Sequence, residues 1–466
     1  MKREASSPAS PSSKRRRRSS TPELKPVISS FSSVSEFGSQ WDEWPAPRAD
    51  MTAAREFIID IVKEKRSVVI VPDKDADGLS AGTLLYKTLR LLGHPPELIS
   101  VHHLQKGTNV HTNEERARLA QFGVDRAVVL DQGSRPGPSL LPTGDPSTMN
   151  VLIVDHHMST EWPEGSKVLT ACRTPPIATA ALLTYMLLRD LHPAVTEKEG
   201  WRAVMGVIGG ADLGTTTAKW GNPPWPGASA DSHRHGAKTM SEAVASINAP
   251  RRTAEYNGQA ECQIFLNADK ASDIATNAFL KLCKLDVNDE TLRWARTPPR
   301  FTTDGRVAVI TIHTGFQVHP VIATRWAGTL GKKSKNLIMI MCANTGFNPD
   351  PSKVSFSCRI AANLRSLPDG ERPDLIGMLN EYGNGIEGFR ERVGGDFARG
   401  HKEATGGIIH KDEFALLLAH MGVPPEGTPR KNTPKKAPPK VVDSSQKTGI
   451  KDYFKPVSAV LEGDAK

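Results

Sequence analysis

Short runs of apolar residues, many of them β-branched, recur in the first third of the chain. They are S-V-V-I-V-P at 67–72, A-V-V-L at 127–130 and N-V-L-I-V at 150–154. Apolar and polar residues do not alternate within these runs, which is typical of parallel strands covered on both faces. Segments with apolar residues at helical spacing lie before, between and after the runs, at 51–62, 80–92, 113–122 and 177–191. The order of these elements predicts an α/β fold built on a parallel sheet.

The pattern weakens over 214–255, where a long loop or insertion precedes a helix near 240–247. A helix around 271–285 is expected to close this first domain. A second α/β unit follows, with candidate strands at 307–312, 337–341 and 354–360 and candidate helices at 320–330, 373–381 and 412–420. We therefore predict an N-terminal parallel-sheet domain over 51–290 and a smaller C-terminal α/β domain over 300–425.

The two ends of the chain differ from its middle in composition and charge. Residues 1–50 are rich in Ser, Pro and Arg, and residues 426–466 in Pro and Lys, so both are predicted to be disordered, basic tails. The formal net charge is +9, to which residues 1–25 contribute +6 and residues 427–466 contribute +5. The part between the tails is therefore near neutral, and its composition alone shows no basic surface for nucleic acid.

Several classes of protein are disfavoured by simple features of the chain. Its apolar stretches are too short to span a bilayer, and no apolar signal segment follows the N-terminus, so we expect no membrane association and no secretion. The five cysteines are odd in number and form no C-x-x-C pair. A disulfide framework or a cysteine zinc site is therefore not expected, and a reducing compartment fits.

Acidic residues and histidines end the three predicted strands of the first domain. The first strand runs into D-K-D-A-D-G at 73–78, the second ends at Asp131, and the third ends at D-H-H, 155–157. In a parallel sheet the carboxyl ends of the strands form one edge, and ligands bind in the crevice outside it. Isolated aspartates at strand ends usually cap turns, but three acidic strand ends in one sheet indicate a shared site.

Carboxylates packed together repel one another unless cations hold them. Oxygen-rich ligation with one or two imidazoles suits Mn²⁺ or Mg²⁺ better than a metal that prefers thiolates. Two such ions can activate a water molecule and stabilise the leaving oxygen in phosphoester hydrolysis. A calcium loop would need a glutamate where Leu84 stands, so that alternative fails.

These motifs, together with G-A-D-L at 210–213, resemble in order and spacing the four motifs of the DHH phosphoesterase superfamily, and most closely its RecJ-like nucleases. The resemblance implies that Asp75 and Asp77 each hold a metal and that Asp131 bridges both ions. His156 would be a further ligand and Asp212 would complete the set, with Asp73 left open as another ligand. His157 would contact the scissile phosphate or protonate the leaving group, and Asp155 would orient a histidine.

A further resemblance lies downstream. G-H-K-E-A-T-G at 400–406 is similar to the signature of the associated C-terminal domain, DHHA1, and S-F-S-C-R-I at 355–360 is similar to its strand with a substrate-binding arginine. The resemblance implies that Arg359, Gly400, His401 and Gly406 bind the substrate. Glycines followed by a helix would form an anion cradle there.

Each tail carries one candidate motif. The basic run Lys14, Arg15, Arg16, Arg17 and Arg18 is typical of a nuclear import signal, which predicts a nuclear location. In the other tail, 447–454 resembles a PCNA-interacting peptide, with Ile450, Tyr453 and Phe454 as the anchors for a sliding clamp. Lys447 stands where that motif usually has Gln.

We therefore expect a metal-dependent phosphodiesterase or exonuclease that uses two Mn²⁺ or Mg²⁺ ions on single-stranded DNA or short oligonucleotides, in nuclear DNA replication or repair. Two alternatives stay open. One is a hydrolase of small phosphates, such as polyphosphate, pyrophosphate or a dinucleotide. The other is a non-catalytic replication scaffold that keeps the fold. Aromatic residues, which would stack bases, make up 6% of the chain, and the sequence places none of them in the cleft.

Overall fold

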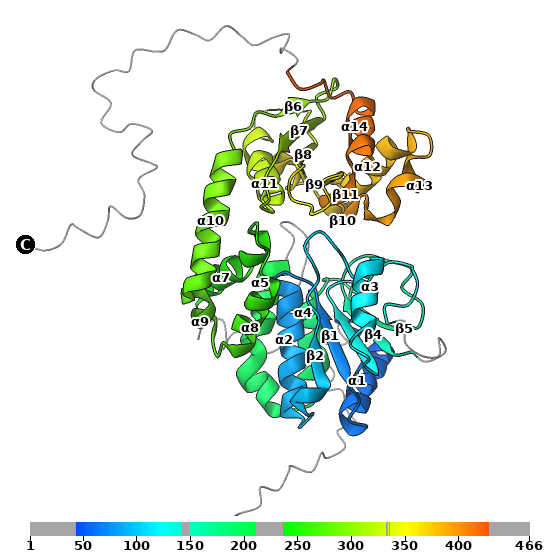
Figure 1. Cartoon of the computed structure of the whole chain (residues 1–466), viewed down its shortest axis with the longest axis vertical. Coiled ribbons are helices and arrows are strands. Elements are labelled where there is room, and N and C mark those ends of the chain that lie inside the picture. Colours follow the sequence, from blue (N-terminus) through cyan, green and yellow to red (C-terminus); the bar gives the residue numbers. More distant parts are fainter. Residues whose placement is uncertain (1–42, 142–148, 211–235, 332–333, 335, 428–466) are drawn as a thin grey trace, which may run out of the picture. The chain divides into compact units, whose positions relative to one another are not determined.

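A computed structural model of the chain describes residues 43–141, 149–210, 236–331, 334 and 336–427. Two β-sheets organise these residues (Figure 1). The first sheet is wholly parallel, with strand order β2-β1-β3-β4-β5. Its strands are β1 (Val68–Pro72), β2 (Ile99–Val101), β3 (Arg126–Leu130), β4 (Val151–Asp155) and β5 (Ser166–Thr170). The predicted α/β fold with a parallel N-terminal sheet is thus confirmed.

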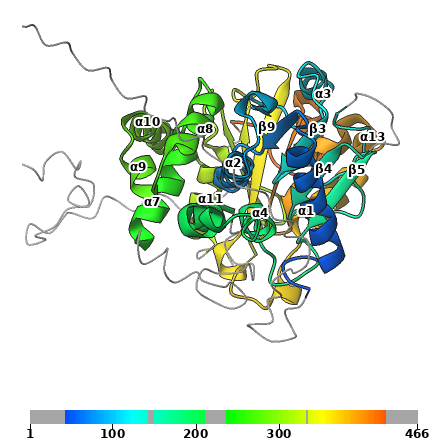
Figure 2. The same ribbon diagram turned by 90° about the horizontal axis from the view of Figure 1, so that it is seen from below.

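Successive residues of the central strands pack into two different cores, which explains why their sequences do not alternate. Ile70 and Val128 lie in a core shared with four helices on one face, whereas Val69 and Val129 lie in a core on the opposite face with Leu119. The helices of this part are α1 (Arg48–Lys63), α2 (Ala76–Leu91), α3 (Asn113–Ala120), α4 (Ala180–Leu188) and α5 (Gly200–Gly210). Figure 2 shows α1, α2 and α4 from below.

A group of helices follows and packs against α2 and α5. Its members are α7 (Ala237–Ile247), the 3₁₀ turn η5 (Pro250–Arg252), α8 (Gly258–Asn267), α9 (Ala271–Thr276) and α10 (Ala278–Trp294). The single helix expected around 271–285 is instead two helices, because the chain leaves the helical conformation at Asn277, whose side chain caps α10. Helix α8 and strands β2 and β5 were not predicted.

The second sheet is mixed, with order β10-β11-β9-β8-β7-β6. Only β7 and β8 pair in parallel within it. Its strands are β6 (Arg300–Phe301), β7 (Val307–Ile312), β8 (Met339–Asn344), β9 (Lys353–Ile360), β10 (Arg399–His401) and β11 (Ala404–His410). Its helices are α11 (His319–Leu330), α12 (Leu375–Asn384), α13 (Phe389–Val393) and α14 (Lys411–His420).

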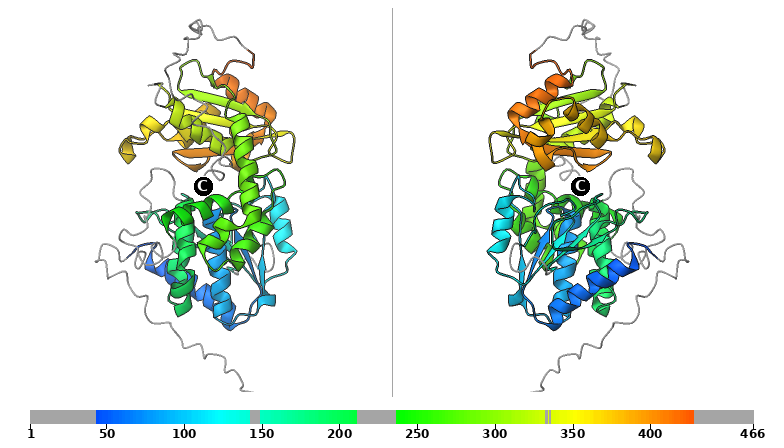
Figure 3. Two further views of the ribbon diagram at one scale, coloured as in Figure 1. Left: turned by 90° about the vertical axis from the view of Figure 1, so that its left-hand side faces the viewer. Right: turned by 90° about the vertical axis from the view of Figure 1, so that its right-hand side faces the viewer.

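Each face of the second sheet has its own apolar core. Val309 and Phe356 pack with residues of α12, α13 and α14, and Ile310 and Ile340 pack with α11. Figure 3 shows α14, in orange, against this sheet. Helices long and apolar enough to cross a membrane are lacking among the residues given above. The domain boundaries proposed from the sequence stay predictions.

Candidate metal centre and active site

The acidic strand ends converge as the sequence predicts. Strand β3 lies between β1 and β4, and the register pairs Pro72 with Leu130 and Leu130 with Val154, so the three strands end at one edge. Donor atoms of Asp73, Asp75 and Asp131 lie within 4.8 Å of one another. Donor atoms of Asp77, Asp131 and His156 form a second such group. Asp131 therefore belongs to both groups, and Asp73 joins the cluster. Asp131 also forms a third group, with Asp155 and His157.

The backbone of Asp131 has an unusual conformation. Its φ angle is +63°, in the left-handed region that non-glycine residues seldom occupy. Its N–H donates to the Val154 carbonyl at 2.9 Å, which ties the residue to the end of β4. Such conformations cost on the order of 1 kcal/mol and gather at functional sites. Here the conformation places a buried carboxylate between the two donor groups.

The first turn of α2 fixes Asp75 and Asp77. Asp75 is the N-cap residue, and its Oδ1 accepts hydrogen bonds from the backbone N–H groups of Asp77 and Gly78. The helix consequently begins at Ala76, earlier than the sequence pattern predicts, and Asp77 lies in its first turn. A Cβ on Gly78 would lie 2.6 Å from the Asp73 carbonyl oxygen, so only glycine permits this approach.

Asp77 is held in a fully buried pocket that the sequence did not indicate. Its carboxylate accepts hydrogen bonds from Ala180 N–H at 3.1 Å and Ala181 N–H at 2.8 Å, at the start of α4. Helix α5 closes the other side with glycines. A Cβ on Gly206 would lie 2.9 Å from Asp77 Oδ1, and one on Gly210 would lie 2.5 Å from Oδ2. The pocket therefore depends on the lack of side chains at both positions.

Burial and mutual repulsion shape the charge states of these acids. Burial and the charge of Asp75 raise the pKa of Asp77 to about 8. Burial and the charges of Asp77 and Asp75 likewise raise the pKa of Asp131 well above its ordinary value. The pKa of Asp75 is lowered, because the charge of nearby Arg251 and the hydrogen bonds from the helix N–H groups outweigh the effect of burial, which acts to raise it. A cation would relieve the repulsion among these groups.

The donors present fit Mn²⁺ or Mg²⁺. Most are carboxylate oxygens, and His156 supplies one imidazole. Burial and the charge of His157 lower the pKa of His156 to about 3, so its ring is neutral and has a lone pair for a metal at neutral pH. His156 Nε2 faces the acids, 3.3 Å from Asp131 Oδ1 and 3.8 Å from Asp77 Oδ2. Among the described residues, Asp131 Oδ1 is buried without a hydrogen bond of acceptable geometry, and a metal ion held by these donors would supply the partner that this oxygen lacks.

His157 has the opposite charge state. Its Nδ1 lies 2.8 Å from Asp155 Oδ1, which also accepts the backbone N–H of His156 at 2.7 Å. Burial lowers the pKa of His157, but the charge and hydrogen bond of Asp155 outweigh it and raise that pKa to about 9. Asp155 thus fixes the ring and keeps it protonated. Asp155 therefore contacts His157 through a hydrogen bond, and its orienting function stays a prediction.

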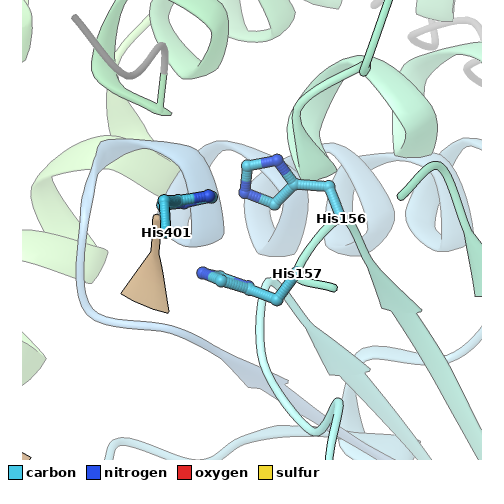
Figure 4. Close-up of side chains that lie close together, drawn as sticks. All are labelled: His156, His157 and His401. Carbon is cyan, nitrogen blue, oxygen red and sulfur yellow. The ribbon is translucent and has the colours of Figure 1, made fainter. Parts of the chain in front are cut away.

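The second sheet contributes a third imidazole. The ring of His401, on β10, stacks against His157 with centroids 5.2 Å apart and lies 5.6 Å from the ring of His156 (Figure 4). Ring nitrogens of the three histidines lie within 4.8 Å of one another. His401, which the sequence predicts to bind substrate, therefore lies beside the two histidines of the D-H-H motif.

The segment 400–406 is not the loop and helix that the anion-cradle interpretation requires. It forms an antiparallel hairpin of β10 and β11, and α14 begins only at Lys411. A Cβ on Gly400 would lie 2.6 Å from the Ala404 carbonyl oxygen, and one on Gly406 would lie 2.3 Å from that of Phe356. These glycines allow close strand packing, so the cradle is corrected to a hairpin that presents His401.

Two arginines that the sequence did not single out face this centre. Arg251, in η5, places Nη2 3.9 Å from Asp75 Oδ2. Arg252 lies next to it, and burial together with the charge of Arg251 lowers its pKa to about 9. The charges of Arg252 and of the predicted Arg359 both act on buried His319, so the arginines form one basic group. Asp212 lies outside the described residues.

Residues 67–205 match the model of the DHH family, N-terminal domain. These residues therefore form a DHH-family N-terminal domain, which supports placing the protein in the DHH phosphoesterase superfamily. Members of the superfamily are generally hydrolases of phosphoester bonds. No curated protein sequence matches the chain.

Several solved structures share the fold of this chain. RecJ from Thermus thermophilus, in complex with Mn²⁺, is 16% identical with a TM-score of 0.55, over 82% of this chain and 55% of RecJ. An exonuclease RecJ bound to manganese is 18% identical with a TM-score of 0.51, over 80% of this chain and 93% of that one. A DHH domain described as belonging to a family of ribosomal proteins is 13% identical with a TM-score of 0.56, over 80% of this chain and 90% of that one. This chain thus spans about half the length of the Thermus RecJ, and the likeness concerns the fold.

Proposed function

We propose that this protein is a metal-dependent phosphodiesterase that hydrolyses single-stranded DNA or short oligonucleotides. The observation that carries the proposal is the place of Asp131 in two adjoining groups of donors, because one carboxylate shared by two groups suits a pair of divalent ions. Asp73 and Asp75 would hold one ion, Asp77 and His156 the other, and Asp131 both. When bound, two Mn²⁺ or Mg²⁺ ions would lower the pKa of water and stabilise negative charge on a phosphate.

The histidines supply the complementary chemistry. The His157 ring, protonated and held by Asp155, would donate a proton or a hydrogen bond to an oxygen of the scissile phosphate. His401 faces the same space from the second sheet, so it would contact the same phosphate from the opposite side. In this proposal His157 contacts the phosphate or protonates the leaving group and Asp155 orients His157, as the sequence predicts.

The basic group beside the centre favours a substrate with more than one phosphate. Arg251 Nη2 lies 3.9 Å from Asp75 Oδ2, and the charges of Arg252 and Arg359 act on each other and on His319. Guanidinium groups bind phosphate oxygens in a bidentate manner. A phosphodiester chain would offer these arginines a phosphate while its neighbour lies at the metal centre. A small-phosphate hydrolase, the alternative function, would use the same metal centre but would not need this additional group of arginines.

The test is one set of incubations of the purified full-length chain. End-labelled single-stranded DNA, single-stranded RNA and polyphosphate are each combined with Mn²⁺ or Mg²⁺, beside the Asp131→Asn variant. We expect oligonucleotides to be shortened by the wild type and to stay intact with the variant. Hydrolysis of polyphosphate alone would replace the proposal with the small-phosphate alternative. A wild type as inert as the variant on every substrate would favour a non-catalytic scaffold.

We further propose, from the sequence, a nuclear location and a sliding-clamp partner. The basic run 14–18 and the anchors Ile450, Tyr453 and Phe454 all lie outside the described residues. A peptide spanning 445–456 should bind a PCNA-like clamp, and a peptide with alanine at Tyr453 and Phe454 should not. A fluorescent fusion that stays nuclear after replacement of Lys14–Arg18 would overturn the import assignment.

A further inference from the structure

A cavity lies near the metal centre. It has a volume of about 670 Å³, within the range of small-molecule sites. Segments from both sheets line it, including the loop after β2, the start of α8 and the loop after β8. The residues that matter here are Gln105, Thr108, Tyr256, Gln259 and Asn348.

Lys74 connects the cavity to the segment that carries the metal ligands. Lys74 directly follows Asp73, and its Nζ donates to the carbonyl oxygen of Thr108, on the cavity wall, at 3.0 Å. The same Nζ lies 5.8 Å from the centre of the Tyr256 ring, which also lines the cavity. Lys74 therefore links the segment that carries the metal-binding acids to the wall of the cavity.

Tyr256 is a fixed aromatic wall. Its hydroxyl donates to the Leu104 carbonyl oxygen at 3.1 Å, and its backbone has a φ angle of +55°. A tethered aromatic ring provides a stacking surface at little entropic cost. This residue is thus an aromatic group beside the centre that the sequence alone could not place.

The other lining groups suit a neutral polar ligand rather than a phosphate. The side-chain amides of Gln105 and Gln259 make no hydrogen bond to any described residue and offer both donors and acceptors. Lys106 donates to the carbonyl oxygens of Ala254 and Gly315, which leaves it engaged elsewhere. The lining carries both signs of charge, because Glu114, Asp350 and Asp396 are acidic while Lys353 is basic, with its Nζ 3.8 Å from Asp350 Oδ2. The cavity therefore has no excess of positive charge that would select a phosphate.

We propose that this cavity receives the nucleobase of the nucleotide next to the scissile phosphate, with Tyr256 stacking on the base and Gln105 and Gln259 contacting its polar edge. The inference rests on the proposed function, since a base occupies the cavity only if an oligonucleotide lies at the metal centre. The cavity would then give the enzyme a preference for nucleic acid over inorganic phosphates and a preference among bases.

The experiment uses short single-stranded DNA substrates in which one abasic residue is moved position by position. With the wild type and Mn²⁺, we expect a rise in KM of roughly ten- to hundredfold at one position next to the cleaved bond, since stacking contributes that much per base. With Tyr256→Ala, KM for the intact strand rises similarly and the abasic residue has no further effect, because both changes remove the same contact. Tyr256→Phe, which keeps the ring, retains the penalty for the abasic residue.

A matched pair of glutamine variants tests the polar edge. Gln259→Ala should change the relative KM values for the four bases at that position, whereas Gln121→Ala, an exposed glutamine after α3, should not. If the strands are cleaved but no abasic position changes KM by more than about twofold, the base site is refuted while the phosphodiesterase stands. If no oligonucleotide is cleaved and polyphosphate is, the proposed function itself fails and the base site fails with it.

Discussion

Replacement of Gly206 by alanine tests how tightly helix α5 is packed against the centre. The added Cβ would lie 2.2 Å from the Ala181 Cβ on α4 and 2.9 Å from Asp77 Oδ1. Carbon atoms in contact prefer about 3.5–4.0 Å, so α5 would have to move by more than about 1 Å from α4. A Cβ cannot rotate out of the way, because it is bonded directly to the backbone.

The expected change in the free energy of unfolding follows from comparison with a glycine that has space for an added methyl group. Gly328, in α11, has no heavy atom within 4 Å of an added Cβ. Gly328→Ala should therefore raise the free energy of unfolding by about 0.5–1 kcal/mol through the gain in helix propensity alone. Gly206→Ala has the same gain but adds an overpacking cost of about 1–3 kcal/mol. We expect the upper end, which leaves that variant less stable than wild type by about 2 kcal/mol.

The assay is thermal unfolding of wild type, Gly206→Ala, Gly328→Ala, Ala181→Gly and the double variant Ala181→Gly/Gly206→Ala, followed by circular dichroism without divalent ions. The midpoint should fall for Gly206→Ala and rise slightly for Gly328→Ala. The double variant should be more stable than the sum of its single changes, because Ala181→Gly removes the atom that clashes. A Gly206→Ala protein as stable as Gly328→Ala would refute the close packing of α5 on Asp77.

Three further outcomes follow from the charges and contacts of the site. Asp131→Asn should raise the unfolding midpoint in EDTA near pH 8, because a carboxyl group whose pKa is raised by folding destabilises the folded protein once the pH exceeds the pKa of the unfolded state. The variant should also lose most of the stabilisation by Mn²⁺. A lower midpoint in EDTA would contradict this reasoning. Glu115→Gln should lower the free energy of unfolding by up to about 3 kcal/mol at pH 7, because hydrogen bonds from His102 and other groups outweigh burial and lower the pKa of Glu115 to about 2. In urea titrations the difference from wild type should shrink as the pH falls below about 4.5. A difference that stays constant with pH would count against the prediction. His401→Ala should raise KM for oligonucleotides about tenfold or more while keeping the Mn²⁺-induced rise in midpoint, and loss of that rise would mean that His401 holds the metal instead.

Much of the centre was predictable because its signals are local in the chain. A buried parallel strand must be apolar throughout, and the residue that follows it lies at the carboxyl edge of the sheet, so Asp73, Asp131 and Asp155 could be placed together from sequence. The start of α2 was predicted less accurately. The pattern of apolar residues begins at Ser80, but the cap formed by Asp75 starts the helix at Ala76.

Periodicity and position along one strand were enough to predict the parallel sheet, the second α/β unit and the acids and histidines at the strand ends. The folded chain was needed to see that Asp131 is shared among donor groups, that Gly206 and Gly210 make room for Asp77, and that Arg251 and Tyr256 lie beside the centre. It also turned the expected cradle at 400–406 into a hairpin. The physical reason is that these features arise from contacts between segments far apart in the chain, and no local pattern of residues records which distant segments will meet.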